Sequence, residues 1–104
     1  MHQDTIQLDE NLILRIAQGD GNAYRILYNE TASTVYAFAL SILRNRYDAE
    51  DVMHDTFIRI YTAAVTYKPL GKPLAWILTI VRNLSYNKII NCFLRAMTSR
   101  WSQT

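Results

Sequence analysis

Apolar residues recur every three to four positions along most of the chain, which is the spacing of one face of an α-helix. No stretch alternates between apolar and polar residues for long enough to form a strand. The expected helices cover residues 9–18, 22–43, 48–64 and 73–97. The pattern therefore predicts an all-α fold, a compact bundle of about four helices.

Local signals indicate where these helices begin and end. Asp20 or Asn22 can cap the second helix, and Asp48 is expected to cap the third. Residues 67–73 contain two prolines and separate the last two helices, because proline cannot continue a helix. Pro73 itself suits the first turn of the last helix.

The chain has 104 residues, half of them hydrophobic, and this is enough apolar material for one core. We expect residues 1–90 to form one helical domain and residues 91–104 to extend the last helix into a tail, with no second domain. A single cysteine, Cys92, excludes an internal disulfide, and no apolar run approaches the roughly 20 residues that span a bilayer. We therefore expect a cytoplasmic protein with no signal peptide and no membrane insertion.

The charged residues divide the sequence into two halves. All nine acidic residues lie in residues 1–55 with four basic ones, whereas residues 56–104 carry seven basic residues and no acidic one. This asymmetry favours two electrostatically different partners, and the basic half suits a polyanion. Chance clustering on a solvated surface is the alternative.

The third helix carries a polar face opposite its apolar stripe. The residues of this face lie three and four positions apart: Asp51, His54, Asp55, Ile58 and Thr62. An isoleucine surrounded by charged residues resembles a contact patch, although lone exposed isoleucines are common. The Asp51–His54 spacing would also suit a metal pair, but the facing helices offer too few carboxylates, so we expect no metal site.

The last helix carries a face of a different kind, rich in amides and aromatic rings. It contains Trp76, Thr79, Asn83, Tyr86 and Asn87, with Arg82 beside them, and the preceding loop adds Tyr67, Lys68 and Lys72. Aromatic rings stack on unpaired bases, amides bond base edges and cations meet phosphates, so this face predicts binding to single-stranded or melted nucleic acid. The alternatives are that the tryptophan belongs to the core and that the amides are simply solvated.

The sequence offers no sign of an enzyme. It contains no glycine-rich phosphate loop, no paired metal-ligand motif and no arrangement of nucleophile and base, and its two histidines, His2 and His54, lie far apart. We expect no catalytic site and no cofactor.

Two blocks of the sequence are distinctive: Asp48-Ala-Glu-Asp-Val-Met-His-Asp-Thr-Phe57 and Pro73-Leu-Ala-Trp-Ile-Leu-Thr-Ile-Val-Arg-Asn-Leu84. They follow Ala17-Gln-Gly-Asp20, Ala23-Tyr24 and Val35-Tyr-Ala-Phe38. In this order, over roughly residues 10–90, the blocks resemble region 2 of bacterial RNA polymerase sigma factors, in the extracytoplasmic-function (ECF) group of the sigma-70 family.

The resemblance implies a helical domain that binds the clamp helices of the largest subunit of core RNA polymerase. It also implies recognition of the minus-ten promoter element, on the non-template single strand, as the element melts. By resemblance, the polymerase-binding positions are Asp48, Asp51, His54, Asp55, Ile58, Arg59 and Thr62. The DNA-binding positions are Tyr67, Lys68, Lys72, Trp76, Thr79, Arg82, Asn83, Tyr86 and Asn87. An anti-sigma factor is a further implied partner.

The sequence departs from the family in three respects. His54 stands where the family commonly has glutamine, and Asn87 and Ile90 stand where it usually has aspartate and arginine, which bears on promoter preference. Sigma factors of this group continue into a second, helix-turn-helix domain, which the tail up to Thr104 does not resemble. The alternative function is therefore that of a truncated sigma-like module, which binds polymerase or an anti-sigma factor without directing initiation.

Overall fold

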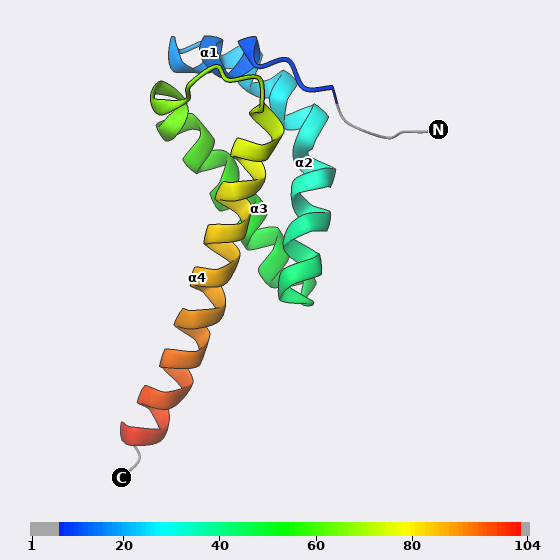
Figure 1. Cartoon of the computed structure of the whole chain (residues 1–104). Helices are drawn as coiled ribbons and strands as arrows, with labels where there is room; N and C mark the ends of the chain where they lie inside the picture. Colours follow the sequence, from blue (N-terminus) through cyan, green and yellow to red (C-terminus); the bar gives the residue numbers. More distant parts are fainter. Residues whose placement is uncertain (1–6, 103–104) are drawn as a thin grey trace.

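The structure, a computed structural model, describes residues 7–102, with side chains up to residue 98. Four α-helices follow one another along the chain, and the described residues form no strand (Figure 1). The helices are α1 (Asn11–Ala17), α2 (Gly21–Leu43), α3 (Arg46–Ala63) and α4 (Pro73–Ser102), with a 3₁₀ turn, η1 (Ala64–Thr66), after α3. The predicted all-α fold of about four helices is confirmed.

The core lies where α2, α3 and α4 pack against one another, and α1 covers one end of this bundle (Figure 1). Each of these three helices contributes buried residues from its apolar stripe. The fully buried larger side chains include Leu27 and Val35 of α2, Val52 and Ile60 of α3, and Ile77 and Val81 of α4. Burying one such side chain stabilises the fold by about 1.5–3 kcal/mol, so these contacts fix which faces of α3 and α4 remain outside.

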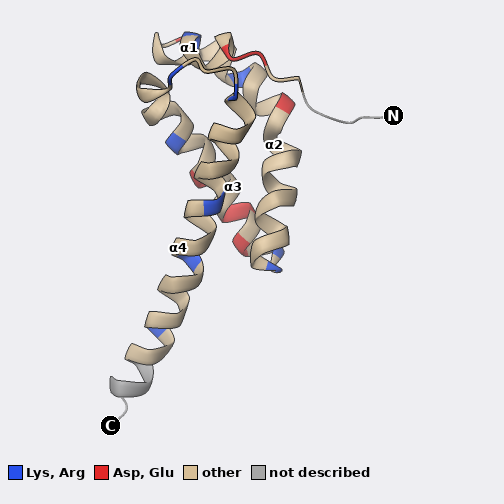
Figure 2. Cartoon of the chain, in the orientation of Figure 1, with Lys and Arg blue, Asp and Glu red and all other residues tan. Residues whose placement is uncertain are grey.

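The second half of α4 projects beyond the bundle (Figure 1). The helix continues to Ser102, past the expected end near Met97. Its projecting part exposes apolar side chains at Ile89, Ile90, Phe93, Leu94 and Met97. Up to residue 98, α4 carries three basic residues, Arg82, Lys88 and Arg95, and no acidic one (Figure 2). Within residues 7–102, no helix combines the length and the hydropathy needed to cross a membrane.

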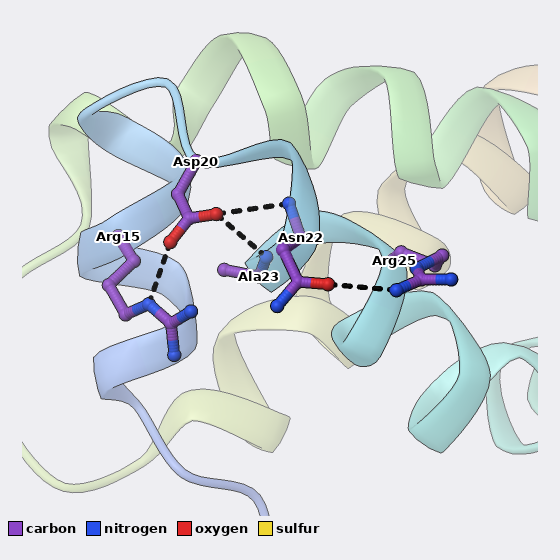
Figure 3. A network of polar contacts seen from close by, with 5 residues as sticks. All are labelled: Arg15, Asp20, Asn22, Ala23 and Arg25. Carbon is purple, nitrogen blue, oxygen red and sulfur yellow. Dashed lines mark hydrogen bonds and ion pairs between the residues drawn. The ribbon is translucent and has the colours of Figure 1, made fainter.

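Asp20, one of the two capping candidates in the sequence, caps α2. Its Oδ1 accepts hydrogen bonds from the backbone N–H groups of Asn22 at 3.0 Å and Ala23 at 3.2 Å (Figure 3). Its Oδ2 accepts a third bond from Arg15 Nε at 2.9 Å. The Ala23 N–H and then the Arg15 guanidinium lower the pKa of Asp20 below its usual value. One carboxylate therefore both starts α2 and ties it to α1.

The cap of α3 differs from the prediction. The helix begins at Arg46 and is capped by Asn45, whose side-chain oxygen accepts a hydrogen bond from the Asp48 N–H at 3.0 Å. Asp48 lies in the first turn instead, where a negative charge is favoured by the helix dipole. The connection is shorter than expected because Arg44 adopts a left-handed conformation, with φ of 55°, and ends α2 at once.

Candidate functional site

The loop between η1 and α4 is anchored by a buried tyrosine. Tyr67 is only 7% exposed, and its ring packs edge-on against Trp76 with 5.1 Å between the ring centroids. Its hydroxyl donates a 2.6 Å hydrogen bond to Glu10 Oε1, immediately before α1. Burial, together with the bond to Glu10, raises the pKa of Tyr67 to about 12. Tyr67, which the sequence predicted as a DNA-binding position, is therefore almost fully buried, and its ring supports Trp76 and the loop.

The loop of residues 67–72 forms a tight turn, and its two lysine side chains are exposed to solvent. The Leu70 N–H donates to the Lys68 carbonyl oxygen at 2.7 Å, which closes a tight turn around Pro69. Gly71 follows with φ of 79°, a backbone conformation that residues other than glycine rarely adopt. Lys68 and Lys72 are both exposed. The turn thus presents two positive charges on a backbone of defined shape.

A pocket of about 310 Å³ lies between this loop and the start of α4. It is lined by Thr66, Tyr67, Lys68, Leu70, Lys72 and Trp76. Small-molecule pockets in proteins usually have volumes of about 300–1,000 Å³, so this one is at the small end of the range. A mostly apolar pocket lined by an indole and two exposed lysines suits a flat ring attached to a phosphate.

Trp76 links the pocket to the outer face of α4. Its side chain is half-buried: it packs against the core and is also partly exposed. The other predicted positions on this face are exposed: Thr79, Arg82, Asn83, Tyr86 and Asn87. The hydroxyl of Thr79 donates a hydrogen bond to the Ala75 carbonyl oxygen at 2.8 Å. The side chain of Tyr86 is 50% exposed. We call the pocket together with these α4 residues the amide–aromatic surface.

The predicted face of α3 also lies outside the core. Asp51, His54, Asp55, Arg59 and Thr62 are exposed, Ile58 is 62% exposed and Asp48 is partly exposed. We call these seven residues the acidic surface. Its position follows from the burial of Val52 and Ile60 on the opposite side of the same helix.

A lysine of α4, the helix that carries the amide–aromatic surface, reaches the acidic surface. Lys88 Nζ lies 3.4 Å from Asp51 Oδ2 and 3.9 Å from Asp48 Oδ1. The oppositely charged halves of the sequence therefore meet in space at this point (Figure 2). The sequence predicted charge separation but not this contact.

Residues 7–102 contain no cluster of three or more residues suited to holding a metal ion. His54 and Asp51 lie on one exposed face of α3, as their spacing predicted. His2, the other histidine, lies outside the described residues.

Three residues with structural consequences escaped the sequence analysis. Glu10 contacts the loop across 57 positions of sequence, and Lys88 contacts Asp51 across 37. Ser85 is fully buried, and its hydroxyl has no hydrogen-bond partner; among the described side chains, no other buried polar atom lacks one. No local pattern signals such long-range contacts, although serine within a stripe of apolar residues hints at close helix packing.

Residues 27–100 match the family model of sigma-70 region 2. The chain belongs to the sigma-70 region 2 family. Its similarity to several proteins named as ECF RNA polymerase sigma factors places it in the ECF group, as the sequence blocks indicated.

Two relatives illustrate this similarity. The chain is 29% identical over 86 residues to the ECF RNA polymerase sigma factor SigK of Mycobacterium sp. (strain KMS), covering 81% of the chain and 45% of SigK. It is 32% identical over 74 residues to the ECF RNA polymerase sigma factor BldN of Streptomyces coelicolor, covering 70% of the chain and 28% of BldN. The region 2 chain thus spans less than half the length of either relative. No solved structure gives a significant match.

Proposed function

We propose that this region 2 chain is a transcription initiation factor domain that binds core RNA polymerase and an unpaired promoter strand. The acidic surface docks on the polymerase, and the amide–aromatic surface captures bases of the minus-ten element as the duplex opens. The observation that carries the proposal is that the amide–aromatic surface is continuous. Trp76 both lines the pocket and begins the exposed face of α4. The chain itself performs no covalent chemistry.

The amide–aromatic surface has the groups that single-strand binding needs. The pocket accepts one unstacked base beside Trp76, and Lys68 and Lys72 neutralise the adjoining phosphates. Asn83 and Asn87 offer amides to base edges farther along α4. Stacking contributes about 1–3 kcal/mol per captured base, which is of the same order as the stacking lost per opened step.

The acidic surface suits a protein partner with basic residues. Ile58 is exposed at the centre of a face that carries Asp51 and Asp55, so an apolar contact is surrounded by charges. Charged residues around an apolar contact steer association and set its orientation. The clamp helices of the polymerase largest subunit are the partner that we propose for this surface.

The DNA part is tested by fluorescence anisotropy with a labelled non-template strand of a minus-ten element. We expect salt-sensitive binding that Asn83→Ala or Trp76→Ala weakens about tenfold, because each removes one base contact. Asn29→Ala is the matched control, since it removes an exposed amide from α2, away from the amide–aromatic surface. Equal binding by folded Asn83→Ala and wild-type chains would refute the assignment.

The polymerase part is tested by charge reversal on the acidic surface. Asp55→Arg should abolish binding to core polymerase, whereas Glu30→Arg, which reverses an exposed acid on α2, should not. Asp55→Arg should leave single-strand binding unchanged. If both variants bind polymerase as the wild-type chain does, the acidic surface is not the docking site.

Run-off transcription separates initiation from binding alone. With core polymerase and this chain as the sole sigma factor, a transcript from a minus-ten promoter supports the initiation role. Binding to both partners without a transcript supports the alternative of an interaction module.

A further inference from the structure

We infer that Glu10 is a positioning residue for promoter DNA: it holds the loop of residues 67–72 in the shape that forms the base pocket. This inference rests on the proposed DNA-binding function. Glu10 belongs to neither of the surfaces described above. It lies immediately before α1, at the N-cap position of that helix.

One carboxylate oxygen holds the loop at two points. Glu10 Oε1 accepts the Tyr67 hydroxyl at 2.6 Å and the Gly71 N–H at 3.1 Å. Between these two anchors, the chain is exposed at Lys68, Pro69 and Leu70. Hydrogen bonds to a charged group are stronger than those to a neutral one, so these are the contacts best able to fix the loop.

The anchors define the walls of the pocket. Tyr67 carries the first bond and packs against Trp76, while the second bond lies next to Lys72, and all three of these residues line the pocket. A loop released from Glu10 would populate several conformations. The apparent affinity for a base then falls by the fraction of time that the pocket is formed.

The charge of Glu10 and its hydrogen bonds have opposite effects on the affinity for DNA. A carboxylate near Lys68 and Lys72 repels phosphate, so removing the charge alone should favour DNA. Removing the hydrogen-bond acceptor should disfavour DNA, because the loop loses its anchors. Glu10→Gln removes the charge but keeps an oxygen that accepts both bonds, whereas Glu10→Ala removes both. The two substitutions therefore separate the roles of charge and position.

The experiment measures the affinity of the wild-type, Glu10→Gln and Glu10→Ala chains for a labelled single strand, under one salt condition. We expect Glu10→Ala to bind about tenfold more weakly, corresponding to a pocket formed about one-tenth of the time. Glu10→Gln should bind at least as tightly as the wild type. Tyr67→Phe, which removes one of the two bonds, should fall between the wild type and Glu10→Ala.

Two further measurements distinguish positioning from a general effect on the fold. Hydrogen exchange of the Gly71 amide should be fast in Glu10→Ala and slow in Glu10→Gln, because only the glutamine keeps an acceptor. Binding of core polymerase to the acidic surface should be unchanged in both variants. If polymerase binding fell in parallel with DNA binding, a general loss of fold would explain the result and the positioning role would be rejected.

The outcomes separate the inference from the function on which it rests. If the wild-type chain binds no single strand, the proposed function fails and the inference fails with it. If the wild type binds and folded Glu10→Ala binds equally well, only the inference fails. If both Glu10 variants bind more tightly than the wild type, Glu10 acts through its charge and the positioning role is wrong.

Discussion

Lys88 gives the sharpest test of the electrostatics of the acidic surface. Its ammonium lies between Asp51 and Asp48, so it partly neutralises the surface proposed to meet a basic partner. Lys88→Met removes the charge and keeps an unbranched apolar side chain. A cationic group of the partner placed about 7 Å from Lys88 is repelled by about 0.6 kcal/mol in water. Removing that repulsion should tighten polymerase binding about threefold.

The same substitution should slightly destabilise the fold. Asp51 is 64% exposed and the Lys88 side chain 29% exposed, so the ion pair is well solvated. Such pairs contribute about 0.2–1 kcal/mol, which predicts a fall in Tm of about 1–8 °C at low salt that shrinks as salt is added.

The assay is a titration of core polymerase with wild-type, Lys88→Met and Arg95→Met chains. Arg95 is exposed on the projecting part of α4, and its substitution removes the same unit of charge away from the acidic surface. We expect tighter binding for Lys88→Met and little change for Arg95→Met. Weaker binding of Lys88→Met would mean that Lys88 itself contacts the polymerase, and the reasoning would be refuted.

Three further predictions concern the fold. Ser85→Ala should raise Tm by about 4 °C in calorimetry, because it removes a buried hydroxyl without a partner, and a lower Tm would show that the hydroxyl is bonded. Asp20→Ala should destabilise the chain by about 1 kcal/mol or more in urea unfolding, because it removes the cap of α2; an unchanged midpoint would contradict that role. The raised pKa of Tyr67 means that its neutral phenol stabilises the fold fully below pH 10 and that this contribution is lost between pH 10 and pH 12. The stability difference between wild type and Tyr67→Phe should therefore shrink over that window, and a constant difference would contradict the assigned pKa.

The helices could be predicted from the sequence because their signals are local. Apolar spacing identified the buried sides of α3 and α4, and Asp20 was one of two candidate caps because an acceptor side chain precedes a helical pattern. The start of α3 was predicted wrongly because Asn45 and Asp48 are both good capping residues. The conformation of Arg44, which decided between them, has no clear sequence signal.

The candidate site was predictable only in part, because some of its features depend on local sequence and others on contacts between distant segments. The side of α4 that faces outward follows from helical periodicity, and Asn83 and Tyr86 are exposed there as expected. The support of the loop by Glu10 and the contact of Lys88 with the acidic surface depend on tertiary packing between distant segments. The roles of all these residues in binding remain predictions.

The most direct test of the central claim is a backbone-amide NMR titration of this 12.1 kDa chain with a single-stranded minus-ten oligonucleotide. The account predicts saturable shift changes in residues 67–72 and around Asn83 and Tyr86, with little change around Asp55 and Ile58. Changes confined to the acidic surface, or no saturable change at low salt, would contradict it.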